Sequence, residues 1–152
     1  MIDTTVYIGR AAGTLPDAVR SLLDRSRLYH STVCLSELAV GIGALPLSHP
    51  RRRDIVSHYE ELFAEIPASR LVLPDSGTWN EAGLIAGTLA RLQGLQPLQR
   101  KQCLNDALIL LSAAKAGHVV LTANRRDFDL LQQLAPETRY VWYGSGPSVS
   151  DR

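Results

Sequence analysis

Residues 104–122, LNDALILLSAAKAGHVVLT, decide the fold class. From residue 104 to residue 116 the side chains are apolar on nearly every face, and Gly117 follows, which predicts a helix buried in the interior. The apolar run 119–121 comes directly after this glycine and is too short for a helix, so it predicts a buried strand. A buried helix that leads into a buried strand is the repeating unit of an α/β protein.

The same alternation extends through the rest of the chain. Helical spacing of apolar residues predicts helices that begin near Pro16, extend over residues 55–66 and extend over residues 75–93. Short apolar runs predict buried strands at 33–35, 71–73, 119–121 and 140–143. Strands that alternate with helices favour a mostly parallel central sheet covered on both faces, so we expect a three-layer α/β/α fold.

Length and composition favour one folded domain. The chain has 152 residues, of which 45% are hydrophobic and 20% are charged, values that are typical of globular proteins. We expect this domain to cover residues 1–143 and to be followed by a flexible tail over residues 144–152, which are rich in Gly, Ser and Pro.

Charge and hydropathy exclude several other classes of protein. No apolar run approaches the roughly 20 residues that cross a bilayer, and no basic stretch with an apolar core opens the chain, so we expect a cytoplasmic protein. Cys34 and Cys103 lie far apart without a zinc or redox motif, so we interpret both as buried apolar residues. The net charge of +1 offers no general attraction to nucleic acid. Any surface that binds RNA must therefore come from the local placement of basic residues.

Acidic residues follow the predicted strands or begin the predicted helices, and each has a structural explanation. Asp3 can cap a turn or helix. Glu37 can stabilise the first turn of a helix capped by Ser36, and Asp106 can do the same behind Asn105. These capping roles explain each carboxylate taken alone.

The surroundings of Asp106 favour a functional role, because a carboxylate on so apolar a helix is costly unless it is paired or bound to a cation. Asn124 and Asp127 follow the strand predicted at 119–121, although either can cap a helix. Ligands of open α/β sheets gather at the carboxyl ends of the strands, so we expect these polar side chains to converge. Carboxylates placed together repel one another unless a hard divalent cation neutralises them, and Mg²⁺ or Mn²⁺ suits this role.

Four segments resemble the characteristic segments of the PIN-domain family, and in particular of its VapC-type toxin ribonucleases. Their order, spacing and placement after strands span nearly the whole chain. The segments are Asp3-Thr4-Thr5-Val6, Ser36-Glu37-Leu38 with Gly41, Asn105-Asp106-Ala107-Leu108-Ile109, and Thr122-Ala123-Asn124 with Asp127-Phe128.

The resemblance implies which residues act. It assigns catalysis and metal binding to Asp3, Glu37 and Asp106, with Asp127 as a further metal ligand. It also implies that Thr4, Thr122 and Asn124, which belong to these segments, support the site. Many PIN domains have an aspartate where this chain has Asn124. The fourth acidic position is therefore filled weakly by an amide, shifted to Asp127, or lost.

The resemblance further implies a Mg²⁺- or Mn²⁺-dependent endoribonuclease that hydrolyses phosphodiesters in single-stranded or loop RNA. It would be the toxin of a type II toxin-antitoxin pair, with a cognate antitoxin protein and a homodimeric assembly. Arg125 and Arg126 can hold flanking phosphates, or they can form an ordinary solvated face. Two alternatives stay open: a non-catalytic PIN-like module that binds RNA or protein, and a metal-dependent DNA nuclease or phosphatase.

Overall fold

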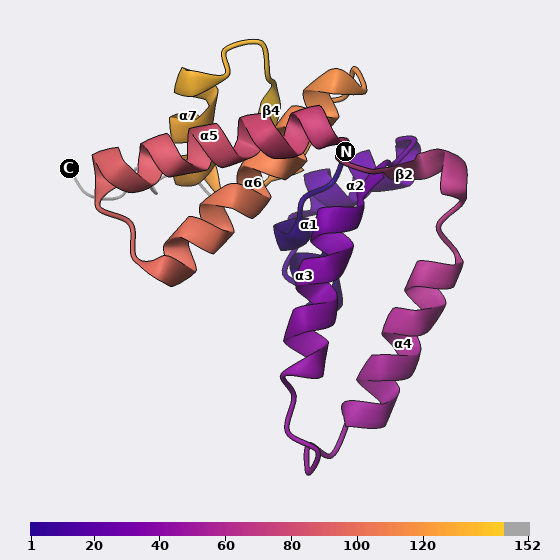
Figure 1. The fold of residues 1–152 in the computed structure, drawn as a ribbon. Coiled ribbons are helices and arrows are strands. Elements are labelled where there is room, and N and C mark those ends of the chain that lie inside the picture. Colours follow the sequence, from indigo (N-terminus) through magenta and orange to yellow (C-terminus); the bar gives the residue numbers. More distant parts are fainter. Residues whose placement is uncertain (145–152) are drawn as a thin grey trace, which may run out of the picture.

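The computed structural model describes residues 1–144, so all of the tail expected over residues 144–152 except Gly144 lies outside the described part of the chain. Short strands separate groups of one or two helices, so the predicted mixture of helices and short strands is present (Figure 1). In chain order the elements are α1 (Thr4–Ala11), α2 (Asp17–Arg25), β1 (His30–Ser31), α3 (Thr32–Gly43), α4 (Arg52–Ala64), η1 (Ala68–Arg70), β2 (Leu71–Val72), α5 (Ser76–Gln93), α6 (Pro97–Lys115), β3 (Val120–Thr122), α7 (Arg125–Leu134) and β4 (Tyr140–Trp142).

The strands form parallel pairs that a single residue connects. β1 pairs with β2 and β3 pairs with β4, both in parallel. Ile2 forms parallel bridges with His30 of β1 and with Leu121 of β3. The spatial order is therefore β2, β1, Ile2, β3 and β4, and every pairing among the described residues is parallel. The expected α/β fold with parallel strands is confirmed, and the three-layer arrangement stays a prediction.

The buried helix predicted at residues 104–116 is confirmed as the second half of α6. Its core residues are at most 6% exposed; they are Ala107, Leu108, Ile109, Leu110, Leu111 and Ala113. α6 begins earlier than predicted, at Pro97, where Gln96 and Gln99 form a capping box. Its first turns are largely exposed, and they therefore lack the apolar pattern from which the sequence analysis predicted the rest of the helix. Gly117 follows α6 with a φ of 73°, in the left-handed region that favours glycine.

The strand predicted at residues 33–35 is wrong, because these residues form the start of α3. Ser31 caps this helix by accepting a hydrogen bond from the backbone N–H of Val33. Val33, Cys34 and Leu35 are buried next to one another in the first turn of the helix. A short apolar run cannot by itself distinguish a buried strand from a buried helical turn, and the strand that precedes it has only two residues.

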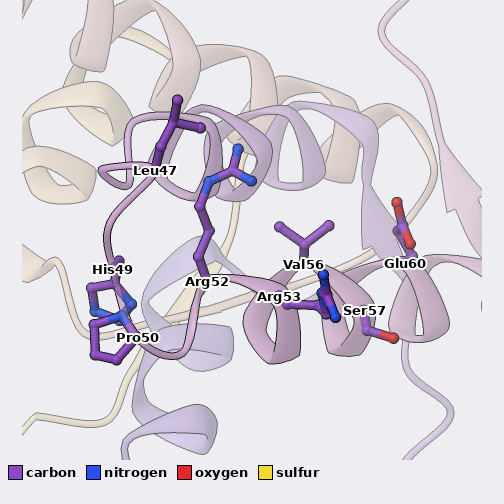
Figure 2. Close-up of a pocket in the computed structure, with 8 residues that line it drawn as sticks. All are labelled: Leu47, His49, Pro50, Arg52, Arg53, Val56, Ser57 and Glu60. Carbon is purple, nitrogen blue, oxygen red and sulfur yellow. The ribbon is translucent and has the colours of Figure 1, made fainter.

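α3 and α4 form a hairpin whose connecting loop projects away from α5, α6 and α7 (Figure 1). No residue of α4 is fully buried. A hollow of about 530 Å³ lies at the tip of the hairpin (Figure 2). The Arg52 side chain extends there toward Leu47, and its Nε atom is buried with no hydrogen-bond partner among the described residues. Within residues 1–144, no helix combines the length and apolarity that are needed to span a membrane.

The role of α6 as the centre of the core predicts a contrast between two leucines of the same helix. Leu108 is fully buried, whereas Leu98 is 69% exposed. We expect Leu108→Ala to lower the free energy of unfolding by about 2–5 kcal/mol, because it removes buried methyl groups and leaves a cavity. Leu98→Ala should change it by no more than about 0.5 kcal/mol, as is usual at the surface. Urea denaturation of both variants measures the difference, and equal losses would contradict this placement of α6.

Candidate functional site

Asp3 lies at the centre of the sheet and at the start of α1. Its backbone N–H donates to the carbonyl oxygen of Leu121, and its side chain is only 3% exposed. The carboxylate oxygen Oδ2 accepts hydrogen bonds from Thr5 Oγ1 at 2.8 Å and from Thr122 Oγ1 at 2.7 Å. Asp3 does cap α1, through the backbone N–H of Thr5. Among the described residues, however, no hydrogen bond involves Oδ1, so this oxygen is available to a ligand.

Glu37 lies on α3 and contacts Thr4 of α1 and Asn105 of α6. Its Oε2 accepts a hydrogen bond from Thr4 Oγ1 at 2.5 Å, and its Oε1 accepts one from Asn105 Nδ2 at 2.8 Å. The prediction that Ser36 caps a helix and that Glu37 lies in its first turn is wrong, because α3 begins at Thr32. Stabilisation of a helix start therefore does not explain this carboxylate. Two neutral donors from two other segments hold it in place.

Asp106 lies well inside α6, and capping does not explain it either. Asn105 is not the N-cap, since that position belongs to Gln96. Burial and the negative charges of Asp3, Glu37 and Asp127 raise the pKa of the Asp106 carboxyl well above its ordinary value of 3.8. Asp3, Glu37 and Asp127 therefore lie near enough to Asp106 for their charges to disfavour its ionisation.

Asn124 connects two of these carboxylates. It is the N-cap of α7, and its Oδ1 accepts from the backbone N–H of Asp127 at 3.4 Å. Its Nδ2 donates to Asp127 Oδ2 at 2.9 Å and to Asp106 Oδ2 at 3.3 Å. Its backbone N–H donates to Thr122 Oγ1, the hydroxyl that also donates to Asp3. The capping role predicted for Asn124 is confirmed, together with contacts that capping does not require.

The donor set fits a hard cation in its chemistry, although the side chains are not arranged around one. Within residues 1–144, no three carboxylate, histidine or cysteine side chains are placed so that they could hold one metal ion together. Instead, threonine and asparagine side chains donate hydrogen bonds to the carboxylate oxygens. Because a carboxylate has about four acceptor positions, these hydrogen bonds leave room for a cation on each group. Mg²⁺ and Mn²⁺ prefer such oxygen ligands.

The two arginines predicted to contact RNA differ in their surroundings. Arg125 forms an ion pair with Asp129, with 3.4 Å between Nε and Oδ2, and its guanidinium lies 5.3 Å from the ring centre of Trp142. Arg126 is exposed, and it has no ion pair among the described residues. Arg126 is therefore the freer of the two cations to meet a phosphate.

Two residues of the site were not identified as site residues from the sequence. Thr5 donates to Asp3 and accepts from the backbone N–H of Ala123, so it connects α1 to the end of β3. Asn105 holds Glu37 instead of capping a helix. A pair of hydroxyl residues directly after an acid was the available signal for Thr5. Asn105 gave no comparable signal, because its contact depends on the packing of α3 against α6.

A groove of about 520 Å³ begins beside Glu37 and Asn105. It passes between α3 and the first turns of α5 and α6, with Lys101 at its wall. Its apolar lining is exposed: Val40 is 58% exposed, Leu73 67%, Trp79 50% and Leu98 69%. Trp79 lies at helical spacing from the buried Ala82 and Ala86 of α5, yet half of its surface is accessible. Exposed apolar side chains that line a groove next to a polar site offer a surface on which a partner can lie.

Comparisons with known proteins support the fold. No family model matches the sequence, and neither does any curated protein. Solved structures of VapBC and FitAB complexes match at a probability of 1.00. A chain of VapBC2 from Rickettsia felis, bound to a DNA fragment from its promoter, has a TM-score of 0.64 at 15% identity, with 95% of this chain and 98% of that chain covered. A chain of VapBC-1 from nontypeable Haemophilus influenzae has a TM-score of 0.65 at 19% identity, with 94% of this chain and 96% of that chain covered. A chain of FitAcB from Neisseria gonorrhoeae has a TM-score of 0.62 at 21% identity, with 86% of this chain and 91% of that chain covered.

The class that these matches define is the fold of chains from VapBC and FitAB complexes, over nearly the whole length of this chain. The likeness that the sequence shows to VapC-type PIN domains is thus confirmed at the level of the fold. With identities of 21% or less, it is a likeness of fold alone.

The raised pKa of Asp106 means that its ionised carboxylate lowers the free energy of unfolding when no metal ion is bound. Above its ordinary pKa of 3.8, ionisation of Asp106 is less favourable in the folded than in the unfolded chain. We therefore expect Asp106→Asn to raise the free energy of unfolding at neutral pH in EDTA, and this gain should disappear as the pH falls below about 4. Chemical denaturation across this pH range measures it, with the exposed Asp24→Asn as a control. A loss of stability at neutral pH would contradict this account.

Proposed function

We propose that this chain is a Mg²⁺- or Mn²⁺-dependent endoribonuclease and the toxin of a toxin-antitoxin pair. The observation that carries the proposal is the Asp106 carboxyl, which lies inside a core helix with its pKa raised by burial and by three other carboxylates. Such a concentration of negative charge is costly, and it is retained where it binds a cation or performs catalysis. A bound Mg²⁺ or Mn²⁺ would lower the pKa of a water molecule and neutralise charge on a phosphate.

The chain's own residues would divide the work. Asp3 and Asp106 would bind the cation, with Asp127 as a further ligand. Thr122 and Thr5 fix one oxygen of Asp3 and leave the other free, which orients the carboxylate. Glu37 would serve as a ligand or as the base that orients the attacking water. Thr4 and Asn105 hold its carboxylate from opposite oxygens, so its position is set before a substrate binds.

Single-stranded or loop RNA is the substrate class that we propose. Arg126 lies one residue beyond the start of α7, close to Asp127, and its free guanidinium can hold a phosphate that flanks the cleaved bond. Clustered carboxylates alone do not distinguish RNA from DNA or from a phosphate monoester. A panel of these substrates therefore belongs in the first assay.

One observation favours the non-catalytic alternative, which is a PIN-like module that binds RNA or protein. The side chains are not arranged around a metal ion in the described part of the chain, and an amide fills a position where many PIN domains have an aspartate. The two readings differ in a measurable property, because a binding module needs neither a metal ion nor ionised Asp3 and Asp106.

Cleavage of a mixed RNA panel tests the proposed activity. We expect cleavage with Mg²⁺ or Mn²⁺ and none in EDTA, and we expect Asp3→Asn and Asp106→Asn each to lower the rate by more than about 100-fold, the upper range for residues that only support a metal ligand. Asp24→Asn, the same change on the exposed face of α2, should leave the rate unchanged. RNA binding without cleavage, unaffected by EDTA, would favour the binding module, and cleavage of DNA alone would reassign the substrate.

We also propose that a cognate antitoxin protein binds this chain. Solved structures that share its fold include VapBC and FitAB complexes. The apolar groove beside Glu37 offers a surface on which a partner segment can lie and reach the carboxylates. A homodimer is part of the same proposal, and the exposed Leu84 and Leu92 of α5 provide apolar surface for a second copy. Sedimentation equilibrium would detect this dimer.

Trp79 is the side chain on which antitoxin binding should depend most, because large aromatic residues in grooves contribute most to interfaces. We expect Trp79→Ala to cost about 2 kcal/mol or more of binding free energy, which is about a 30-fold rise in Kd. Leu22→Ala, an exposed apolar residue on α2, should leave the Kd unchanged. Calorimetry with the protein encoded beside this chain measures both, and an unchanged Kd for Trp79→Ala would place the interface elsewhere.

A further inference from the structure

The tip of the α3–α4 hairpin carries three consecutive arginines that the carboxylate site does not use. Arg51 is the N-cap residue of α4, and Arg52 and Arg53 begin the helix. None of the three forms an ion pair among residues 1–144. Arg51 and Arg53 are exposed, whereas Arg52 is half-buried. The hairpin tip therefore concentrates positive charge in a chain whose formal net charge is only +1.

The hollow at this tip, of about 530 Å³, lies directly beside the arginines (Figure 2). Arg52 and Arg53 line it from the first turn of α4, and Glu60 lines it from about two turns further along the helix. Two guanidinium groups and one carboxylate leave the lining with a positive charge, in addition to the imidazole of His49. The Nε atom of Arg52 is buried and has no acceptor among the described residues. A donor that has lost its water in this way gains from an anion that accepts its hydrogen bond.

The start of α4 adds backbone donors at the same place. The Arg51 side chain forms no cap hydrogen bond. The first hydrogen bond along the helix runs from the Ile55 N–H to the Arg51 carbonyl oxygen, so the N–H groups of Arg53 and Asp54 have no partner within residues 1–144. Asp54 brings a carboxylate to this turn, but it does not line the hollow. Guanidinium groups next to free N–H groups at a helix start are the donors that phosphate prefers.

We propose that the hollow at the tip of the α3–α4 hairpin binds a backbone phosphate of the RNA, through Arg52 and Arg53. This inference rests on the proposed RNA substrate, and it adds a second contact away from the carboxylates. Glu37 lies six residues before Gly43, the end of α3, which corresponds to about 9 Å along the helix axis. The hollow lies beyond that end, at the tip that projects away from α5, α6 and α7 (Figure 1). It would therefore hold a phosphate several nucleotides from the cleaved bond, and it would position the strand without touching the reacting atoms.

The lining of the hollow favours RNA over a protein partner. Protein interfaces are anchored by large aromatic and apolar side chains. No Phe, Tyr or Trp lines this hollow, and its apolar residues are Leu47, Pro50 and Val56. The groove beside Glu37, which contains Trp79, offers such an anchor instead.

Binding of a labelled single-stranded RNA of about 20 nucleotides, measured by fluorescence anisotropy in EDTA at several salt concentrations, tests the inference without cleavage. We expect the double variant Arg52→Ala and Arg53→Ala to raise the Kd roughly tenfold at low salt. Two lost phosphate contacts should also make the slope of log K against log salt shallower by about 1.4, since each contact on a single strand contributes about 0.7. Arg139→Ala, which removes an exposed arginine just before β4, should change neither quantity.

Arg53→Glu provides a second variant in case the loss of the half-buried Arg52 disturbs folding. Arg53 is exposed, so reversal of its charge should leave the melting temperature unchanged and still weaken RNA binding. In the cleavage assay the same variant should raise KM for the long RNA and leave kcat unchanged, because it touches no reacting group.

An unchanged Kd and salt slope in both hairpin variants would overturn the inference, and so would an equal loss in Arg139→Ala. Weaker antitoxin binding with unchanged RNA binding would also overturn it, because the hollow would then serve a protein. Weaker RNA binding in the hairpin variants of a protein that cleaves no RNA would contradict the proposed activity and still support the phosphate site.

Discussion

The parallel pairing of Ile2 with both β1 and β3 is the constraint on which the rest of the site depends. One residue joins the two strand pairs, and the next residue along the chain is Asp3. The same pairing places Asp3 beside Thr122 at the carboxyl end of β3. Parallel strands direct their carboxyl ends to one edge of the sheet, which is where ligands of α/β proteins bind. The packing that forms the core therefore also assembles the site.

Concentrating carboxylates at this edge opposes stability, and neutral donors offset part of the cost. Threonine hydroxyls donate hydrogen bonds to Asp3 and Glu37, and asparagine amides donate hydrogen bonds to Glu37, Asp106 and Asp127. None of these donors carries a full charge. The negative charge is thus held in place without being neutralised. The remaining repulsion, together with burial, raises the pKa of Asp106. Charge that is held in place in this way lowers the stability of the fold near neutral pH.

The sequence was sufficient for the α/β fold with parallel strands, for three of the four predicted strands and for the buried part of α6. It failed where local signals have two meanings. The apolar run at residues 33–35 suits a strand and a buried helical turn equally well, so the start of α3 was misplaced and Glu37 was assigned to a first turn. Asn105 suited a helix cap because the exposed first turns of α6 lack an apolar pattern. Tertiary packing resolves both ambiguities.

The fold alone does not determine what this site does, because chains of the same fold can differ in the few residues that perform the chemistry. In this chain Asn124 contacts three residues of the site: its backbone, carbonyl and amide groups meet Thr122, Asp127 and Asp106. An amide differs in polarity from a carboxylate of nearly the same volume, because it donates hydrogen bonds where an ionised carboxylate only accepts them. Asn124 therefore places a donor beside Asp106 and Asp127, where an aspartate would add a further negative charge.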